Sequence, residues 1–161
     1  MKLAVSIYLP KRRAVDSHEP PTPTFGLGNI AEKNKYVPVV DIDQKLSYKQ
    51  LIDVVRTGWN IFGLSGYVIV NTMKGHHVIW ETTVNWKQLN TLWTKLKHIL
   101  DHHWITLQRK RKYAILRVRG KYIDSDLCIY EEVLSNEDPC FEKWYSLYKH
   151  LMGGKKCQAS H

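Results

Sequence analysis

Two aspartates separated by one apolar residue, Asp41-Ile42-Asp43, are the residues of this chain best suited to chemistry. They end a β-type run that begins at Tyr36. Successive side chains of a strand point to opposite faces, so both carboxylates face one way and Ile42 faces the other. Like charges on one face repel each other, and a hard divalent cation between them relieves the repulsion. The spacing predicts a Mg²⁺ or Mn²⁺ site, with a solvated strand end as the alternative.

A short basic turn, Lys74-Gly75-His76-His77, is the second stretch that could bind a ligand. A glycine in a tight turn lets backbone amides approach a phosphate, and a neighbouring lysine supplies positive charge. The alternative is an ordinary hairpin turn, in which glycine is common. The turn therefore predicts a phosphate contact if it lies near the two aspartates.

Hydrophobic periodicity predicts the elements that must position these residues. Apolar residues recur at three- and four-residue steps over 48–62 and again after Asn85, which predicts two amphipathic helices. The predicted strands cover 37–43, 67–71, 77–82, 104–107, 113–119 and 127–133, and a last helix covers 137–152. The central order β-α-β-β-α-β predicts an α+β, ferredoxin-like and RNA-recognition-like core with one open sheet face and an extra C-terminal helix.

The chain is predicted to form one folded core with appendages. Residues 1–36 hold a first strand and four of the six prolines, which predicts an irregular arm. Residues 37–134 form the predicted core, 135–152 the C-terminal helix and 153–161 a flexible tail. A length of 161 residues, 43% of them hydrophobic, suits a single domain.

The formal net charge of +9 favours an anionic partner, above all nucleic acid. No apolar run is long enough to span a membrane, so no membrane partner is expected. The three cysteines, Cys128, Cys140 and Cys157, have no C-x-x-C spacing, which argues against a zinc knuckle and against a disulfide framework. We therefore expect an intracellular, cytoplasmic location, which for a virus protein would be the host cytoplasm.

Strand alternation predicts that charged side chains from several strands gather on the open sheet face. The first and third core strands are central neighbours in this topology, and a later strand adds two arginines. Carboxylates that hold a metal, with cationic groups that hold phosphate, are the parts needed for phosphoryl transfer. The set consists of Asp41, Asp43, His77, Glu81, Arg117 and Arg119.

These residues resemble the catalytic core of the archaeo-eukaryotic primase superfamily, which includes primase small subunits and primase-polymerases of plasmids and viruses. Its D-h-D motif is similar to Asp41-Ile42-Asp43, and its S-G-x-x-G-x-H-x-W hairpin motif is similar to residues 71–80. Gly75 and His77 match that second motif, whereas its serine and first glycine are replaced and its tryptophan is displaced by one residue. Leu100-Asp101 resembles the third motif, and residues 116–121 resemble the family's basic strand.

The resemblance implies a primase-like nucleotidyltransferase, abbreviated relative to larger family members. It implies that Asp41, Asp43 and Asp101 hold Mg²⁺ or Mn²⁺. Its partners would be nucleoside triphosphates, a single-stranded DNA or RNA template and a replication protein. The residues implied to bind the nucleotide are Lys74, Gly75, His77, Arg117, Arg119 and Lys121.

Two other functions fit the same residues. A metal-dependent nuclease would use Glu81 together with the aspartates to activate water. A non-catalytic RNA-recognition-like protein would bind nucleic acid through its sheet, although carboxylates on that sheet would repel phosphate. In each case the basic cluster is predicted to contact the nucleic-acid backbone from a hairpin tip. This cluster consists of Arg109, Lys110, Arg111 and Lys112.

Overall fold

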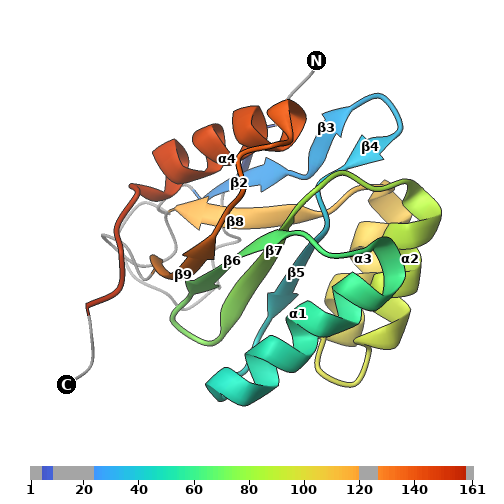
Figure 1. Ribbon diagram of the computed structural model, residues 1–161, viewed down its shortest axis with the longest axis horizontal. Helices are drawn as coiled ribbons and strands as arrows, with labels where there is room; N and C mark the ends of the chain where they lie inside the picture. Colours follow the sequence, from blue (N-terminus) through green and yellow to red (C-terminus); the bar gives the residue numbers. More distant parts are fainter. Residues whose placement is uncertain (1–4, 9–23, 120–126, 159–161) are drawn as a thin grey trace, which may run out of the picture.

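A four-stranded antiparallel sheet forms the centre of the computed structural model, which describes residues 5–8, 24–119 and 127–158 (Figure 1). Its strand order is β5-β7-β6-β9, and β6 and β7 form a hairpin. In this order β5 pairs with β7, so Asp41 lies directly opposite His77. The strands are β5 (Val39–Ile42), β7 (His76–Glu81), β6 (Gly66–Asn71) and β9 (Cys128–Val133).

Helices α1 (Tyr48–Phe62) and α2 (Trp86–Lys95) pack against one face of this sheet, as the periodicity predicts. Both helices begin with a capping box, which satisfies amides that lack an intrahelical partner. Buried tryptophans fix their positions. The Trp80 indole donates to the Val55 carbonyl of α1 at 3.0 Å, and the Trp93 indole of α2 donates to the Val39 carbonyl at 3.0 Å.

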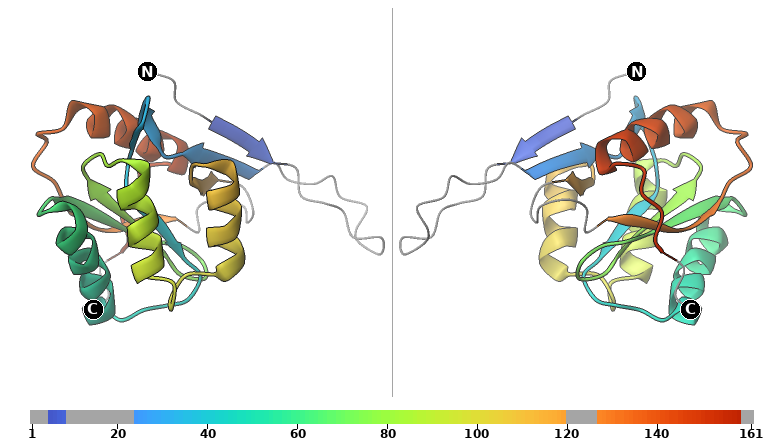
Figure 2. Two further views of the ribbon diagram at one scale, coloured as in Figure 1. Left: turned by 90° about the vertical axis from the view of Figure 1, so that its right-hand side faces the viewer. Right: turned by 90° about the vertical axis from the view of Figure 1, so that its left-hand side faces the viewer.

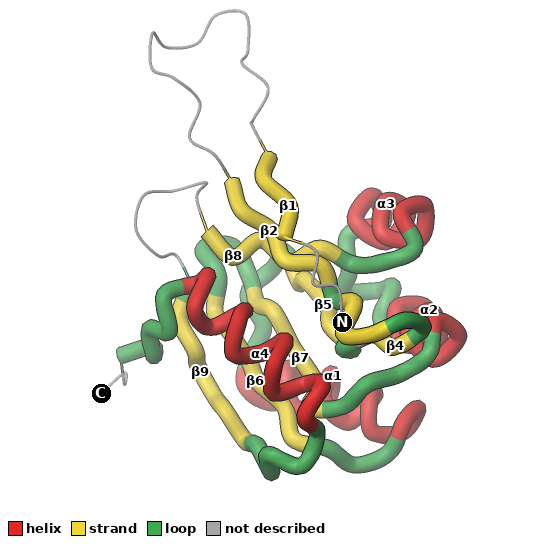
Figure 3. The backbone as a smooth tube through the Cα atoms, turned by 90° about the horizontal axis from the view of Figure 1, so that it is seen from above, coloured by secondary structure: helices red, strands yellow, loops and turns green. Residues whose placement is uncertain are grey.

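The other face of the sheet is covered by helix α4 (Pro139–Met152), so the prediction of an open face is wrong (Figure 3). Every residue of β7 is buried. The Tyr148 hydroxyl reaches Nδ1 of His77 at 2.9 Å, and the Tyr145 hydroxyl donates to Glu132 of β9. The reason is the composition of α4, which buries a row of large aromatic side chains that need an apolar partner.

A second sheet, in the order β1-β2-β8, takes the strand that the ferredoxin-like pattern assigns to the central sheet. Its strands are β1 (Val5–Tyr8), β2 (Thr24–Gly28) and β8 (Ile115–Arg119). Leu27 pairs with Leu116, and Figure 2 shows β1 beside β2. The fold is therefore a mixed α+β arrangement of antiparallel sheets, and the β-α-β-β-α-β order is not confirmed. Residues 24–36 are not an irregular arm, because they also form β3 (Ile30–Glu32) and β4 (Lys35–Tyr36).

Residues 102–111 form helix α3 (His102–Arg111), where the sequence predicts a strand and a hairpin tip. Asp101 is its N-cap, and Lys112 ends it with a left-handed φ of 67°. The buried residues Ile105 and Gln108 are three positions apart, which is helical spacing that a short apolar run obscures. The basic residues in the last turn of α3 suit the negative end of the helix dipole.

A disulfide joins Cys128 of β9 to Cys157, so the expectation that the cysteines form no disulfide is wrong. The segment 155–157 runs along β9, with the Ile129 amide donating to the Lys155 carbonyl at 2.7 Å and the Cys157 amide donating to the Ile129 carbonyl at 2.9 Å. Cysteines 29 residues apart gave no spacing motif, and the strand contact brings them together. Within the described residues no helix has the length and apolar character needed to cross a bilayer.

Candidate active site

A cavity of about 200 Å³ lies where β5, the β6–β7 turn, the start of α3 and β8 meet. Within the described part of the chain, five of the predicted site residues line it, three of them carboxylates and two of them cations. The structure thus brings together residues that are up to 76 positions apart in the chain. The lining residues are Asp41, Asp43, Thr72, Met73, Lys74, Asp101, Trp104 and Arg117.

Asp41 is the most perturbed carboxylate of this cavity. Its pKa is raised to about 6, mainly by burial; the charge of Arg117 opposes the rise, and the charges of Asp43 and Asp101 add to it. At neutral pH three carboxylates thus share a confined space with one nearby guanidinium. A divalent cation between them would relieve both the repulsion and the cost of desolvation.

The carboxylates come from different local structures. Asp43 lies in the exposed loop that follows β5. Asp101 accepts a hydrogen bond from the His103 amide at 2.8 Å as the N-cap of α3, so its position is set by that helix. Carboxylate oxygens are the ligands that Mg²⁺ and Mn²⁺ prefer, so the donor chemistry fits these ions. Among the described residues, however, no group of three or more His, Cys, Asp or Glu side chains is arranged so that it could hold a metal ion.

The β6–β7 turn is held by hydrogen bonds within the turn and from the Lys45 side chain, and it packs closely against the end of β5. The Thr72 amide donates to the Gly75 carbonyl, and the Gly75 amide donates to Thr72 Oγ1, both at 2.9 Å. The Lys45 ammonium donates to the carbonyls of both turn residues. A β-carbon on Gly75 would lie 1.7 Å from the Ile42 carbonyl oxygen. Gly75 therefore allows close packing that brings Lys74 to the cavity, and its amide is engaged within the turn instead of facing a phosphate.

His76 fastens the same turn from the other side. The Leu46 amide donates to its Nε2 at 3.0 Å, and its Nδ1 lies 2.8 Å from Asn71 Oδ1. Burial, helped by the charge of Lys45, lowers the pKa of His76 to about 4. The ring is therefore neutral at physiological pH, with Nδ1 as the donor, and its role is to position the turn.

His77 lies beneath Asp41 and does not line the cavity. Only 1% of the residue is exposed. Its Nε2 is 3.6 Å from Asp41 Oδ1, and its Nδ1 is 2.9 Å from the Tyr148 hydroxyl. The direct phosphate contact implied by the family resemblance thus does not match this position. Tyr148, which sequence reasoning did not place at the site, could have been suspected from the aromatic residues at helical spacing in α4.

Glu81, the residue expected for a nuclease, lies at the opposite end of β7. It pairs with Gly66, and its carboxylate accepts hydrogen bonds from the Ser135 amide at 2.8 Å and from the Asn136 amide at 2.8 Å. Four residues along a strand separate it from His77, a distance of about 13 Å. Glu81 therefore orders the loop after β9 and does not join the aspartates.

The predicted basic residues outside the cavity lie in different structural environments. Arg109 donates from Nε to Asn90 Oδ1 at 3.0 Å and from Nη2 to Thr94 Oγ1 at 2.7 Å, so it ties α3 to α2. Its neighbours at 110–112 end α3. Arg119 ends β8, where its backbone pairs with β2, but its side chain lies outside the described part of the chain, as does Lys121.

No protein-family model, curated protein or solved structure matches this chain. Its function must therefore be inferred from the geometry of the cavity. Three acidic groups beside a lysine and an arginine can bind a cation and an anion together. A metal-bound phosphate is one ligand whose chemistry would meet both requirements.

Proposed function

We propose that this protein is a divalent-metal-dependent nucleotidyltransferase that joins nucleotides on a single-stranded nucleic-acid template. The supporting observation is the single cavity lined by Asp41, Asp43, Asp101, Lys74 and Arg117. All five belong to the larger set that the resemblance to primases assigns to metal and nucleotide. Their convergence from four separate elements supports a common role in phosphoryl transfer.

In this proposal each side chain has a defined task. Asp41, Asp43 and Asp101 would hold Mg²⁺ or Mn²⁺, which neutralises charge on the transferring phosphate and positions the attacking hydroxyl. Arg117 would bind phosphate oxygens through its planar guanidinium, and Lys74 would add a second positive charge. His77 would keep Asp41 in place from below.

The size of the cavity favours the charged part of a nucleotide over a whole ligand. Its volume of about 200 Å³ is below the roughly 300–1,000 Å³ typical of small-molecule pockets. The phosphates and the metal would enter the cavity, while the sugar and base would lie outside it. This arrangement suits an enzyme that accepts several bases, as template-directed synthesis requires.

The test is product formation with labelled nucleotides. The protein is incubated with Mn²⁺ or Mg²⁺, a mixture of labelled NTPs or dNTPs and single-stranded DNA or RNA. We expect labelled strands longer than one nucleotide, and their loss in the double variant Asp41→Asn/Asp43→Asn. Asp53→Asn is the matched control, because Asp53 is an exposed carboxylate of α1 that pairs with Arg56. Unchanged synthesis by the double variant would overturn the proposal, and shortened input strands without synthesis would replace it with a nuclease.

A further inference from the structure

Most of the net positive charge of the chain lies in helices α2 and α3 and their connection. Residues 86–112 contain seven Lys and Arg residues and a single acidic residue, Asp101, a formal charge of +6 out of the total of +9. One sixth of the sequence thus carries two thirds of the net charge. Figure 2 shows these two helices side by side on one side of the molecule.

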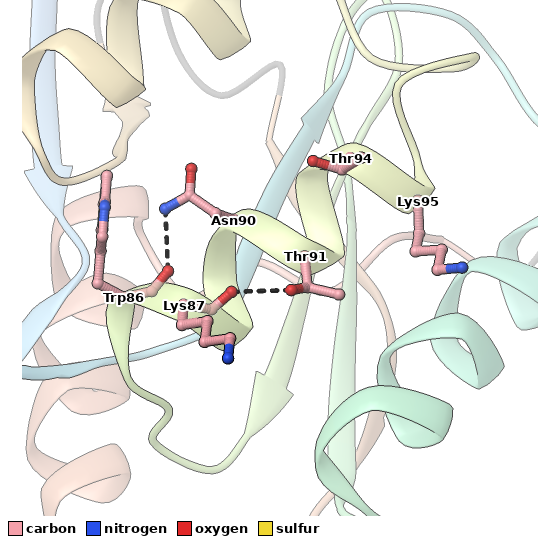
Figure 4. A pocket seen from close by; sticks show the side chains of 6 residues that line it. All are labelled: Trp86, Lys87, Asn90, Thr91, Thr94 and Lys95. Carbon is pink, nitrogen blue, oxygen red and sulfur yellow. Dashed lines mark hydrogen bonds between the residues drawn. The ribbon is translucent and has the colours of Figure 1, made fainter.

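A shallow groove of about 480 Å³ follows the outer side of α2 (Figure 4). Lys87 lies near its start and Lys95 near its end, eight residues apart, which is about 12 Å along a helix axis. No carboxylate of the described residues lines the groove. Its lining residues are Trp86, Lys87, Asn90, Thr91, Thr94 and Lys95.

The uncharged polar groups of the groove already have partners. Asn90 Nδ2 donates to the Trp86 carbonyl and Thr91 Oγ1 donates to the Lys87 carbonyl, each at 2.9 Å. Arg109 of α3 uses the remaining oxygens of Asn90 and Thr94. By contrast, within the described chain neither lysine forms an ion pair with a carboxylate. The two ammonium groups are therefore the groups left for an external anion.

Helix α3 connects this groove to the catalytic cavity. Its N-cap, Asp101, lines the cavity, and its last turn contacts α2 through Arg109. Ten helical residues span about 15 Å, which corresponds to a few nucleotides of an extended strand. After Asp101, residues 102–112 contain no acidic residue, so a strand that enters the cavity could continue along α3 toward the lysines of the groove without meeting another carboxylate of this helix.

We propose that the groove along α2, defined by Trp86, Lys87 and Lys95, binds the backbone of single-stranded nucleic acid. The lysines neutralise phosphates, and the apolar part of the groove beside Trp86 gives unpaired bases a contact that a duplex does not offer. The choice of nucleic acid rests on the proposed function. Because this surface lies outside the catalytic cavity, strand binding can be measured without catalysis.

The test measures fluorescence anisotropy of a labelled 20-nucleotide oligothymidylate in EDTA, without nucleotides, over a range of salt concentrations. In the variant Lys87→Glu/Lys95→Glu we expect affinity at low salt to fall by about tenfold or more, and the slope of log K against log salt to shrink by about 1.4 because two phosphate contacts are lost. The control Lys49→Glu/Lys143→Glu changes exposed lysines of α1 and α4 and makes the same change in net charge. Its affinity should fall by less than about threefold.

Three results would overturn the surface assignment. One is an equal loss of oligonucleotide affinity in the two double variants while their circular dichroism is unchanged, since binding would then reflect net charge alone. Another is that unlabelled duplex DNA of the same length displaces the labelled oligothymidylate as effectively as unlabelled single strands do. The third is binding of wild type to anionic phospholipid vesicles with no binding to the oligonucleotide. The variant Asp41→Asn/Asp43→Asn should keep full oligonucleotide binding, so loss of synthesis and loss of strand binding are separable.

Discussion

Replacing Asp41 by asparagine should stabilise the metal-free protein, although it should abolish catalysis. Asparagine keeps the shape of the side chain and removes a charge that burial, Asp43 and Asp101 all disfavour. Arg117 would lose an attraction, but it still faces the other two carboxylates of the cavity. The expected gain in the free energy of unfolding tests whether the three carboxylates repel one another in this cavity.

The magnitude follows from the raised pKa of Asp41. A pKa of about 6 in the folded state, against 3.8 for an ordinary aspartate, means that the ionised carboxylate destabilises the folded state by at most about 3 kcal/mol at pH values above 6. Since 31% of the Asp41 side chain is exposed, solvent screening reduces this, and we expect about 1 kcal/mol. The folded state binds the extra proton, so this destabilisation develops as pH rises from about 4 to 6 and is absent below that range.

Thermal unfolding by circular dichroism checks the prediction at pH 8 and pH 4, in EDTA and in Mn²⁺. At pH 8 in EDTA, Asp41→Asn should raise Tm by about 2–4 °C, and the gain should vanish at pH 4. Mn²⁺ should stabilise the wild type more than the variant. The control Asp53→Asn should change stability by less than about 0.5 kcal/mol. A variant that is less stable than wild type at pH 8, or a gain equal at both pH values, would refute the crowded-carboxylate reasoning.

Three further predictions concern the contacts that hold the site. Gly75→Ala should cost more than about 4 kcal/mol in urea unfolding, because its β-carbon meets the Ile42 carbonyl oxygen at 1.7 Å; a loss under 1 kcal/mol would contradict this packing. Reduction of the Cys128–Cys157 disulfide should cost about 3.6 kcal/mol from loop entropy over 29 residues, and equal urea midpoints with and without reductant would argue against it. Tyr148→Phe should lower the free energy of unfolding by about 1–2 kcal/mol, because the buried His77 Nδ1 loses its hydrogen bond to the Tyr148 hydroxyl; a gain in stability would show that this hydrogen bond does not stabilise the fold.

Local sequence patterns determined the part of the fold that builds the centre of the site. The helix predicted over 48–62 matches α1, and the predicted hairpin strands match β6 and β7 within a residue at each end. Periodicity and capping residues act over a few positions, so they can be read without knowledge of the partner. For the same reason the outward direction of Asp41 from β5 and the turn at Lys74 could be predicted.

The segment that packs against each element could not be predicted from local sequence patterns. Strand β8 fits a fourth strand of the central sheet by its pattern, but it pairs with β2, which the sequence suggested was irregular. The alternation that put His77 and Glu81 on one face was sound, yet α4 and the loop after β9 bury both. An apolar pattern specifies that a face needs a partner and not which segment supplies it.

The sequence by itself determined the chemistry available to this protein: a pair of strand-end aspartates, a basic turn and a strong positive charge. Only the tertiary structure decided that Asp101 and Arg117, 60 and 76 residues beyond Asp41, share its cavity, and that Glu81 does not. The physical reason is that ligand chemistry resides in individual side chains, whereas their meeting depends on packing between elements far apart in the chain. That packing also decided that His77 lies behind the cavity, held by Tyr148.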